Sequence, residues 1–341
     1  MKDGPVPHAS AAPRPMGALA ADALLLTAAV IWGSTFIAQK LATERMGPVS
    51  FNGVRFLLGA LVLLPFAVRR FRRIADPRVR RESIVGGLLA GVAMTFGSTL
   101  QQVGMHDTSA SNAGFITGLY VIIVPMLGLL VGQRVGWNVW WGAALAVAGL
   151  FFLSVYDPAG GAFAVNTGDL WVLGCAFAWA FHVQVIGWAA RDADAFVISV
   201  VQFAVTGAVA LAASQALAAF AAPEWGAREA ITLDALRAVA GPMAFATLLS
   251  TCIAFTLQTV AQGSAPPAHA AILLSLEGVF AALAEAVCLA AGWTGLGAPF
   301  TRWKVLGCGL MFAGVVLSQW RLRPRAAPGA DGPGPGPGPP G

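Results

Sequence analysis

Long apolar runs separated by short polar segments dominate the sequence of this 341-residue chain. A helix needs about 20 mainly apolar residues to cross the hydrocarbon core of a bilayer, and ten runs approach or exceed that length. The predicted spans form two groups of five: 19–41, 48–68, 84–104, 110–132 and 137–154, then 169–190, 195–220, 240–261, 268–290 and 302–320. This pattern predicts an all-α polytopic membrane protein with ten transmembrane helices.

The composition excludes a soluble globular protein. Charged residues make up 11% of the chain and hydrophobic residues 57%, whereas a typical soluble domain carries roughly 25% charged residues. The four cysteines lie inside apolar runs without paired spacing, which indicates buried hydrophobic side chains rather than disulfides or a metal site. The sequence has no nucleotide-binding glycine loop with lysine, no metal-ligand cluster and no nucleophile–base arrangement. We therefore expect neither an enzyme nor a bound cofactor or metal.

The two ends of the chain differ from the apolar runs. Residues 1–18 are polar and rich in Pro and Ala, and no clear cleavage site follows the first run. We therefore expect a cytoplasmic N-terminal segment rather than a removed signal peptide. Residues 321–341 end in GPGPGPGPPG and predict a disordered tail. Between these ends we expect two five-helix units, at 19–154 and 169–320.

Positive charge is concentrated in one loop. The net charge is +5, and seven arginines lie from Arg69 to Arg81, between the second and third runs. A basic loop beside the membrane marks the cytoplasmic side and attracts anionic lipids, so nucleic-acid binding is not expected. With the N-terminus inside, 14 Lys and Arg residues fall on the inner side and six on the outer side. This count predicts a bacterial-type inner-membrane protein with both termini in the cytoplasm.

The two groups of spans share an internal repeat. Shifts of 147, 157 and 165 residues align Asp22 with Asp169, Trp32 with Trp179, Arg55 with Gln202, Phe56 with Phe203, Thr99-Leu100-Gln101 with Thr256-Leu257-Gln258, and Gly142 and Gly149 with Gly307 and Gly314. Because five is an odd number, the two halves enter the membrane from opposite sides. Inverted repeats are typical of secondary transporters, whose substrate site lies near the midplane between the halves.

Several segments resemble the EamA-type transporters of the drug/metabolite transporter superfamily. They are Trp32-Gly33-Ser34-Thr35-Phe36, Arg55-Phe56, Leu100-Gln101, residues 108–120 and Val124-Pro125 in the first half, and Thr256-Leu257-Gln258, Ala261-Gln262 and residues 271–277 in the second. The resemblance covers about residues 19–320. It implies a fold of two inverted five-helix repeats and a permease for small metabolites or drugs, often an exporter.

Three charged residues inside predicted spans are the first candidates for the substrate or ion pathway, because such groups usually face a cavity or a partner. Glu277 is expected to bind substrate or to exchange protons, since burial favours its neutral form; the alternative is a structural carboxylate. Arg55 is expected to bind a substrate carboxylate or to pair with Glu277, and the alternative is a fixed ion pair or a helix clamp. Glu285, about 80° around the helix from Glu277, would line the same face or support a helix interface.

Uncharged residues complete the candidate set. Gln101 and Gln258 occupy equivalent positions and are expected to frame one pseudo-symmetric cavity, whereas Trp32 and Trp179 would form an aromatic wall. The other candidates for the pathway are His182 and Asn112. For all of these the alternative is helix packing or interhelical hydrogen bonding. His269, near the start of a span, is interpreted as a packing residue.

These observations predict a secondary transporter that moves small organic metabolites, amino acids or drugs by alternating access. The leading hypothesis is a proton-coupled exporter. The expected partners are a small-molecule substrate, the lipid bilayer and protons, and a homodimer stays open as an oligomeric state. One alternative is a nontransporting membrane sensor or scaffold, which would need an effector domain or a long signalling tail. Another is a membrane-embedded lipid enzyme, which would need clustered His, Asp and Glu at an interface.

Overall fold

The computed structural model describes residues 16–108, 110–154, 156, 167–293, 295 and 299–320. Throughout these residues the regular secondary structure is helical, without a strand. The all-α class predicted from the sequence is therefore confirmed. The predicted tail at 321–341 and residues 1–15 of the predicted N-terminal segment lie outside the described residues.

Eight helical segments of the described chain are long and apolar enough to cross a membrane. In chain order they are α1 (Ala18–Thr43), α2 (Pro48–Arg73), α3 (Pro77–Gly104), α4 (Ala110–Gly118) with α5 (Tyr120–Leu130), α7 (Thr167–Ala189), α8 (Ala195–Phe220), α11 (Ala240–Phe245) with the π-helix η1 (Ala246–Ala254) and α12 (Phe255–Gln262), and α13 (Pro267–Leu274) with α14 (Glu277–Ala290). Each overlaps one predicted span closely. The chain is thus a multi-pass membrane protein.

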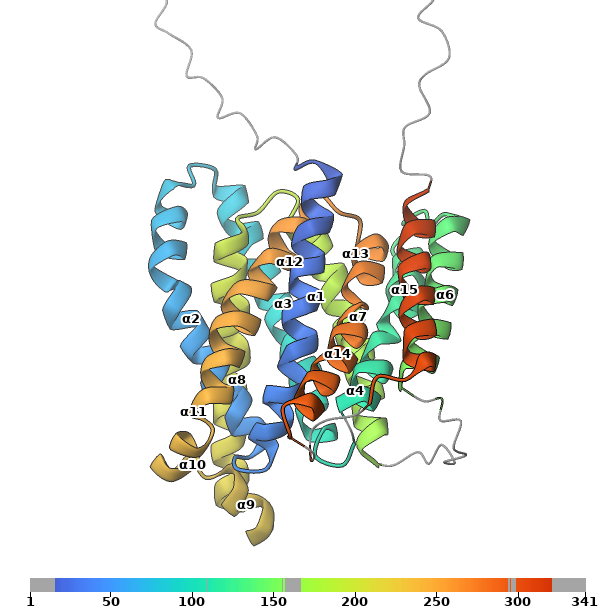
Figure 1. The fold of residues 1–341 in the computed structure, drawn as a ribbon. Coiled ribbons are helices and arrows are strands. Elements are labelled where there is room, and N and C mark those ends of the chain that lie inside the picture. The colour runs from blue at the N-terminus through green and yellow to red at the C-terminus, as the bar shows by residue number, and fades with distance from the viewer. Residues whose placement is uncertain are drawn as a thin grey trace, which may run out of the picture.

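The predicted spans at 137–154 and 302–320 correspond to α6 (Trp137–Ser154) and α15 (Arg302–Gln319). These two helices are shorter or less apolar than the eight that can cross a membrane. The apolar part of α6 has 17 residues or fewer. α15 has 18 residues, and Arg302 and Lys304 in its first turn lower its hydropathy. The two helices pack against each other along their lengths (Figure 1).

Glycines bring α6 and α15 into close contact. A Cβ atom built on Gly149 would lie 2.6 Å from the carbonyl oxygen of Gly307, and one built on Gly142 would lie 2.7 Å from the carbonyl oxygen of Gly314. Side chains larger than hydrogen would therefore separate the helices, which explains the small residues at these four positions. The 165-residue shift aligns Gly142 with Gly307 and Gly149 with Gly314. The contacts are crossed relative to this alignment, because Gly149 lies against Gly307 and Gly142 lies against Gly314.

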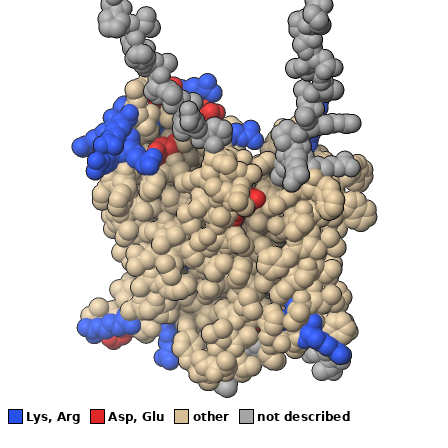
Figure 2. Space-filling view, turned by 45° about the horizontal axis from the view of Figure 1, so that its top comes forward, with Lys and Arg blue, Asp and Glu red and all other residues tan. Residues whose placement is uncertain are grey.

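The two ends of the helical bundle differ in charge. The α2–α3 connection, the start of α1 and the end of α15 lie at one end, which we call the Arg-rich end, at the top of Figure 1. Figure 2 shows Lys and Arg side chains gathered at this end, with smaller groups at the other. The Arg-rich end contains the seven arginines from Arg69 to Arg81, which lie in the last residues of α2 and the first residues of α3.

The opposite end is covered by the connection between α8 and α11, which contains the short helices α9 (Pro223–Glu229) and α10 (Leu233–Ala238) (Figure 1). The Glu229 carboxylate accepts hydrogen bonds from the backbone N–H groups of Val49, at 3.1 Å, and Ser50, at 2.7 Å. It therefore caps the first turn of α2, where backbone donors lack partners within the helix. Arg228 donates to the Thr43 carbonyl oxygen at the end of α1, at 3.0 Å.

Two membrane-spanning segments are broken at equivalent places. α4 ends at Gly118 and α5 begins at Tyr120, whereas α13 ends at Leu274 and α14 begins at Glu277. The 157-residue shift that aligns Gln101 with Gln258 also brings Tyr120 onto Glu277. Both breaks therefore place the first residue of a half-helix, with a polar side chain, near the middle of its span.

Candidate functional site

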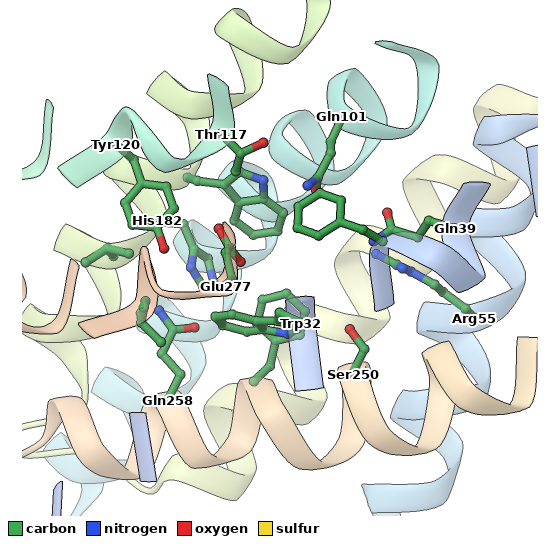
Figure 3. A pocket seen from close by; sticks show the side chains of 15 residues that line it. Trp32, Gln39, Arg55, Gln101, Thr117, Tyr120, His182, Ser250, Gln258 and Glu277 are labelled. Carbon is green, nitrogen blue, oxygen red and sulfur yellow. The ribbon is translucent and has the colours of Figure 1, made fainter. Parts of the chain in front are cut away.

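An internal cavity lies where both breaks meet α1, α7 and the η1–α12 segment (Figure 3). Its volume open to a water-sized molecule is about 50 Å³, well below that of pockets that hold drug-sized ligands, so in this conformation the side chains largely fill it. Seven of the nine pathway residues proposed from the sequence line it: Trp32, Arg55, Gln101, Trp179, His182, Gln258 and Glu277. These residues come from both sequence repeats, so the cavity is shared by the two halves of the chain.

Arg55 contributes a buried positive charge to the cavity. Its side chain is 2% exposed, and its Cζ atom lies 4.5 Å from the ring centre of Phe56 and 5.7 Å from that of Phe51. Within the described residues, its Nε and Nη1 atoms have no hydrogen-bond partner. The rings stabilise the cation by cation–π interaction but leave donors free. A guanidinium with free donors can bind an anionic group.

Glu277 contributes a buried carboxylate. It is the first residue of α14, it is 5% exposed, and the Tyr120 side chain hydrogen-bonds to it. In the part of the chain that the structure describes, the second carboxylate oxygen, Oε1, has no partner. The N-terminus of a half-helix carries partial positive charge, which favours a carboxylate there. Glu277 is thus held in place with one oxygen free to accept a donor.

Arg55 and Glu277 line the same cavity without forming an ion pair. None of the ion pairs among the described residues joins them, and Figure 3 shows the two side chains approaching the cavity from different directions. The fixed pair that was one expectation for Arg55 is therefore wrong for this conformation. Each group is buried and has polar atoms without a partner among the described residues.

Aromatic side chains form one wall of the cavity, centred on Phe255 at the start of α12. The Phe255 ring centre lies 4.6 Å from that of Trp32, 5.7 Å from that of Trp179 and 6.0 Å from that of His182. Trp179 stacks on Phe255 with an angle of 25° between the ring planes. The two equivalent tryptophans thus contact one phenylalanine, which the sequence analysis did not single out.

Gln101 and Gln258 both line the cavity, in keeping with their equivalent positions. Gln258 donates to Gln262 Oε1 at 2.8 Å, and its own Oε1 lacks a partner among the described residues. His182 lies with Nε2 2.9 Å from Oε1 of Gln202, the residue that the repeat aligns with Arg55. Where the first half has a cation, the second half therefore has a histidine–glutamine pair.

Glu285 and Asn112 do not line the cavity. Glu285 Oε2 lies 3.6 Å from Lys304 Nζ, which joins α14 to α15. The expectation that Glu277 and Glu285 face one cavity is wrong, because eight residues of helix carry Glu285 about 12 Å further along the axis. Asn112 lies on α4 outside the cavity lining and has interactions of its own.

Besides Phe255, three polar residues of the cavity were missed as candidates: Thr117, Tyr120 and Ser250. The repeat could have found Tyr120, because the shift between Gln101 and Gln258 places it on Glu277. Ser250 lies on the π-helix η1, and π-helical turns are frequent at functional sites. No sequence pattern distinguishes Ser250 or Thr117 from other hydroxyl residues in apolar helices.

A multi-pass helical bundle with a partly charged cavity that both repeats line has the architecture of a membrane transporter. The chain belongs to the EamA-like transporter family, whose family model matches residues 19–155 and again residues 166–320. The resemblance found in the sequence is thereby confirmed. The protein is a transporter rather than an enzyme, and it acts on a small-molecule substrate in a lipid bilayer.

Similar proteins agree with this assignment. A protein of Archaeoglobus fulgidus described as an uncharacterized transporter is 32% identical over 274 residues, which cover 80% of this chain and 79% of that protein. The uncharacterized inner membrane transporter YedA of Escherichia coli is 28% identical over 157 residues, 45% of this chain and 48% of YedA. A solved crystal structure has a TM-score of 0.62 and 20% identity, covering 87% of this chain and 96% of the other. That likeness supports the fold alone.

Proposed function

We propose that this protein is a secondary active transporter that moves small organic solutes by alternating access, with ten helices in two inverted five-helix repeats. The observation that carries the proposal is the central cavity, which Arg55 and Glu277 line. Both side chains are almost fully buried, and each has polar atoms without a hydrogen-bond partner among the described residues. Charged groups inside a membrane are costly, so they usually face a cavity or a partner and mark a functional site. A solute that binds between them would supply the missing partners.

The helix packing supports the inverted repeat. α2 packs on α8, and α6 packs on α15, so the second and fifth predicted spans of each half contact their own counterparts. α3 packs on α7, whereas η1 and α12 pack on α1, which is the same contact with the halves exchanged. Reciprocal contacts of this kind are expected when a two-fold axis relates the halves. α6 and α15 would then complete the set of ten spans.

The charge distribution supports an orientation with both termini in the cytoplasm of a bacterial-type inner membrane. The start of α1, the end of α15 and the arginines from Arg69 to Arg81 share the Arg-rich end (Figure 2). Cytoplasmic segments near the membrane carry the excess of Lys and Arg. The opposite end, with α9 and α10, would face the outside.

The chemistry of the cavity favours solutes that have an acidic group, a basic group and an apolar body. Arg55 would bind the acidic group, the free oxygen of Glu277 would bind the basic group, and the wall of Trp32, Trp179 and Phe255 would contact the body. Amino acids are the simplest solutes of this kind. Cationic amphipathic drugs would use Glu277 and the aromatic wall without Arg55.

Glu277 is also the residue proposed to couple transport to protons. A carboxyl group can bind either a proton or a basic group of the substrate, and this competition links the two. If the proton is taken from the outside and released inside while the solute moves outward, the protein acts as an exporter.

The test is a reconstitution experiment. Wild-type protein in proteoliposomes is assayed with labelled amino acids and with a cationic dye, with and without an imposed pH gradient. We expect the gradient to raise accumulation at least several-fold, and Glu277→Gln to remove this effect. Glu285→Gln, a matched carboxylate outside the cavity, is expected to keep it. Transport that ignores the gradient, or that Glu277→Gln leaves unchanged, would contradict proton coupling at Glu277.

A cellular screen tests the substrate class and the direction. Cells that lack the gene and cells that overproduce the protein are compared for release of metabolites and for drug resistance. Increased release on overproduction supports export. If no solute moves in cells or in vesicles, the result would contradict transport and favour the alternative of a nontransporting sensor or scaffold.

A further inference from the structure

A groove separate from the central cavity lies between α1, α11 and α14, toward the end of the bundle opposite the Arg-rich end (Figure 1). Its volume open to a water-sized molecule is about 630 Å³, compared with about 50 Å³ for the central cavity. α1 packs against both α11 and α14, so it forms the floor of the groove and the other two helices form its walls. We call this hollow the lateral groove.

The lateral groove is elongated along the helix axes. Its α1 residues are Ser34, Ile37, Ala38 and Leu41, and on α14 the lining residues recur at the same spacing from Phe280 to Cys288. Residues spaced by three and four positions lie on one face of a helix, and the rise per residue makes each stripe about 10–12 Å long. The groove therefore has the shape of a slot that runs across the membrane, in the direction of the lipid chains.

The lateral groove is apolar. None of its described lining residues has a charged side chain, and the hydroxyl of Ser34 donates to the Val30 carbonyl oxygen at 3.0 Å. A hollow without free polar partners does not hold ordered water. Its α14 wall is open to the surroundings, because Leu283 is 40% and Val287 68% exposed. Since α1 and α14 belong to membrane-spanning segments, the surroundings are lipid hydrocarbon.

Small residues leave the lateral groove open on one side of a tight contact. At Gly33, near the middle of α1, an added Cβ would lie 2.5 Å from Phe280 Cβ and 2.6 Å from the Glu277 carbonyl oxygen, so α1 and α14 touch there. Further from the Arg-rich end, a Cβ built on Gly241 of α11 would meet no atom within 4 Å. The groove thus begins at mid-depth and continues to the end of the bundle.

Charged groups of both signs lie near the mouth of the lateral groove. Glu44 and Arg45 are exposed and follow the α1 stripe directly. Asp234 and Arg237 form an exposed ion pair, at 3.7 Å, on α10, which directly precedes α11. Trp293 also lines the groove, and tryptophan is enriched where membranes meet water. The mouth therefore matches a head group that has both a phosphate and an ammonium group.

We propose that the lateral groove binds one acyl chain of a zwitterionic phospholipid, whose head group lies at the mouth. The chain supplies the van der Waals contacts that an empty groove lacks, and the charged residues at the mouth hold the head group at the water boundary. The bound chain lies against α1 and α14, the helices that carry Trp32 and Glu277, and stabilises their packing. The inference uses only the membrane location of these helices and does not depend on the proposed substrate or coupling.

The experiment identifies the lipid that stays on the purified protein. Wild-type protein is reconstituted with phosphatidylethanolamine that carries a diazirine in one acyl chain, extracted in detergent, separated from loose lipid by size exclusion and then irradiated. Peptide mass spectrometry locates the label. We expect label on the α1 and α14 stripes and none at Leu61, an exposed residue of α2 outside the groove, where lipid exchanges freely.

Filling variants make the result specific. Ala284→Phe on α14 and Gly241→Leu on α11 each occupy the groove and are expected to lose the label. Ala208→Phe, at an exposed alanine of α8 outside the groove, is the matched control and should keep it. A ligand that binds only the folded protein raises its stability. Phosphatidylethanolamine added to delipidated protein should therefore raise the unfolding temperature of the wild type and of Ala208→Phe, but not of the filling variants.

Label that is spread evenly over the lipid-facing helices, or that both filling variants retain, would overturn the proposal. Wild-type protein that carries no label and elutes as a dimer would instead assign the groove to a second copy of the chain. Label confined to the groove, in protein that moves no solute in the reconstitution assay, would count against the proposed function alone.

Discussion

The two halves of this transporter supply the cavity with equivalent residues at some positions and different ones at others. Trp32 and Trp179, and Gln101 and Gln258, are identical pairs under the repeat and line the cavity together. Tyr120 and Glu277 are aligned but differ, and Arg55 is aligned with Gln202. The shared residues give the cavity its shape, whereas the divergent positions give it one cation and one anion. Duplication therefore accounts for the architecture, and divergence accounts for the chemistry.

The largest effect on transport is expected when Arg55 is replaced by the residue that the second half has at the equivalent position. Arg55→Gln copies the residue found at the aligned position 202 and removes the free guanidinium donors from the cavity. A hydrogen bond to a charged group contributes about 1.5–3 kcal/mol, so we expect transport of acidic or zwitterionic solutes to fall about 10- to 100-fold. Initial uptake rates in proteoliposomes measure this effect.

Arg45→Gln is the matched control, because Arg45 is exposed at the opposite end of the bundle. It is expected to transport at the wild-type rate. If Arg55→Gln transports zwitterionic amino acids normally and loses only stability, then Arg55 has a structural role. The difference between Arg55 and Gln202 would then not explain how the cavity binds a solute.

A moderate effect is expected at Phe255, which both tryptophans contact. Phe255→Leu keeps an apolar side chain but removes the ring between Trp32 and Trp179. Aromatic contacts contribute about 0.5–1.5 kcal/mol beyond simple burial, so the KM of aromatic solutes should rise about two- to tenfold. The KM of small aliphatic solutes should change less. Equal changes for the two classes of solute would argue against an aromatic wall that contacts the substrate.

The smallest effect on transport is expected at the contact between α6 and α15, where both halves have glycines at equivalent positions. Gly149→Ala places a methyl group against the Gly307 carbonyl oxygen, and overpacking of this kind costs about 1–3 kcal/mol. We expect a lower thermal unfolding temperature but an unchanged KM in the folded fraction. Gly309→Ala, on the same helix pair but with no atom within 4 Å of the added Cβ, should unfold like the wild type. A change in KM for Gly149→Ala would place this contact in the transport pathway.

The sequence was a good guide wherever a residue broke the local pattern. Apolar runs predicted the long helices because a helix in lipid must satisfy its own backbone, and Arg55 and Glu277 stood out because charge is rare there. Tyr120 and Phe255 were missed because an aromatic residue inside an apolar run is unremarkable by composition. Their role depends on which residues lie opposite them, and that is a property of packing between distant segments.

Interactions between candidates were harder to predict than the candidates themselves. The expected contact between Arg55 and Glu277 required a distance across the bundle that no spacing along the chain supplies. Glu285 was placed on the face of Glu277 by angle, but its distance along the helix axis brings it to Lys304 instead. His269 was interpreted as a packing residue, and it hydrogen-bonds between helices to Asp22, a partner 247 residues earlier that spacing along the chain does not identify.

The breaks before Tyr120 and Glu277 have a mechanical consequence. A continuous helix behaves as a stiff rod, so a displacement at one end moves the other. In the two broken spans the joints use short-range bonds, such as Leu119 N–H to Ile116 O at 3.2 Å and Gly278 N–H to Ser275 O at 3.2 Å, which resist bending less than a continuous ladder. Under the proposed alternating access, each of these spans would pivot at the depth of the cavity, so that one half-helix moves while the other keeps its place.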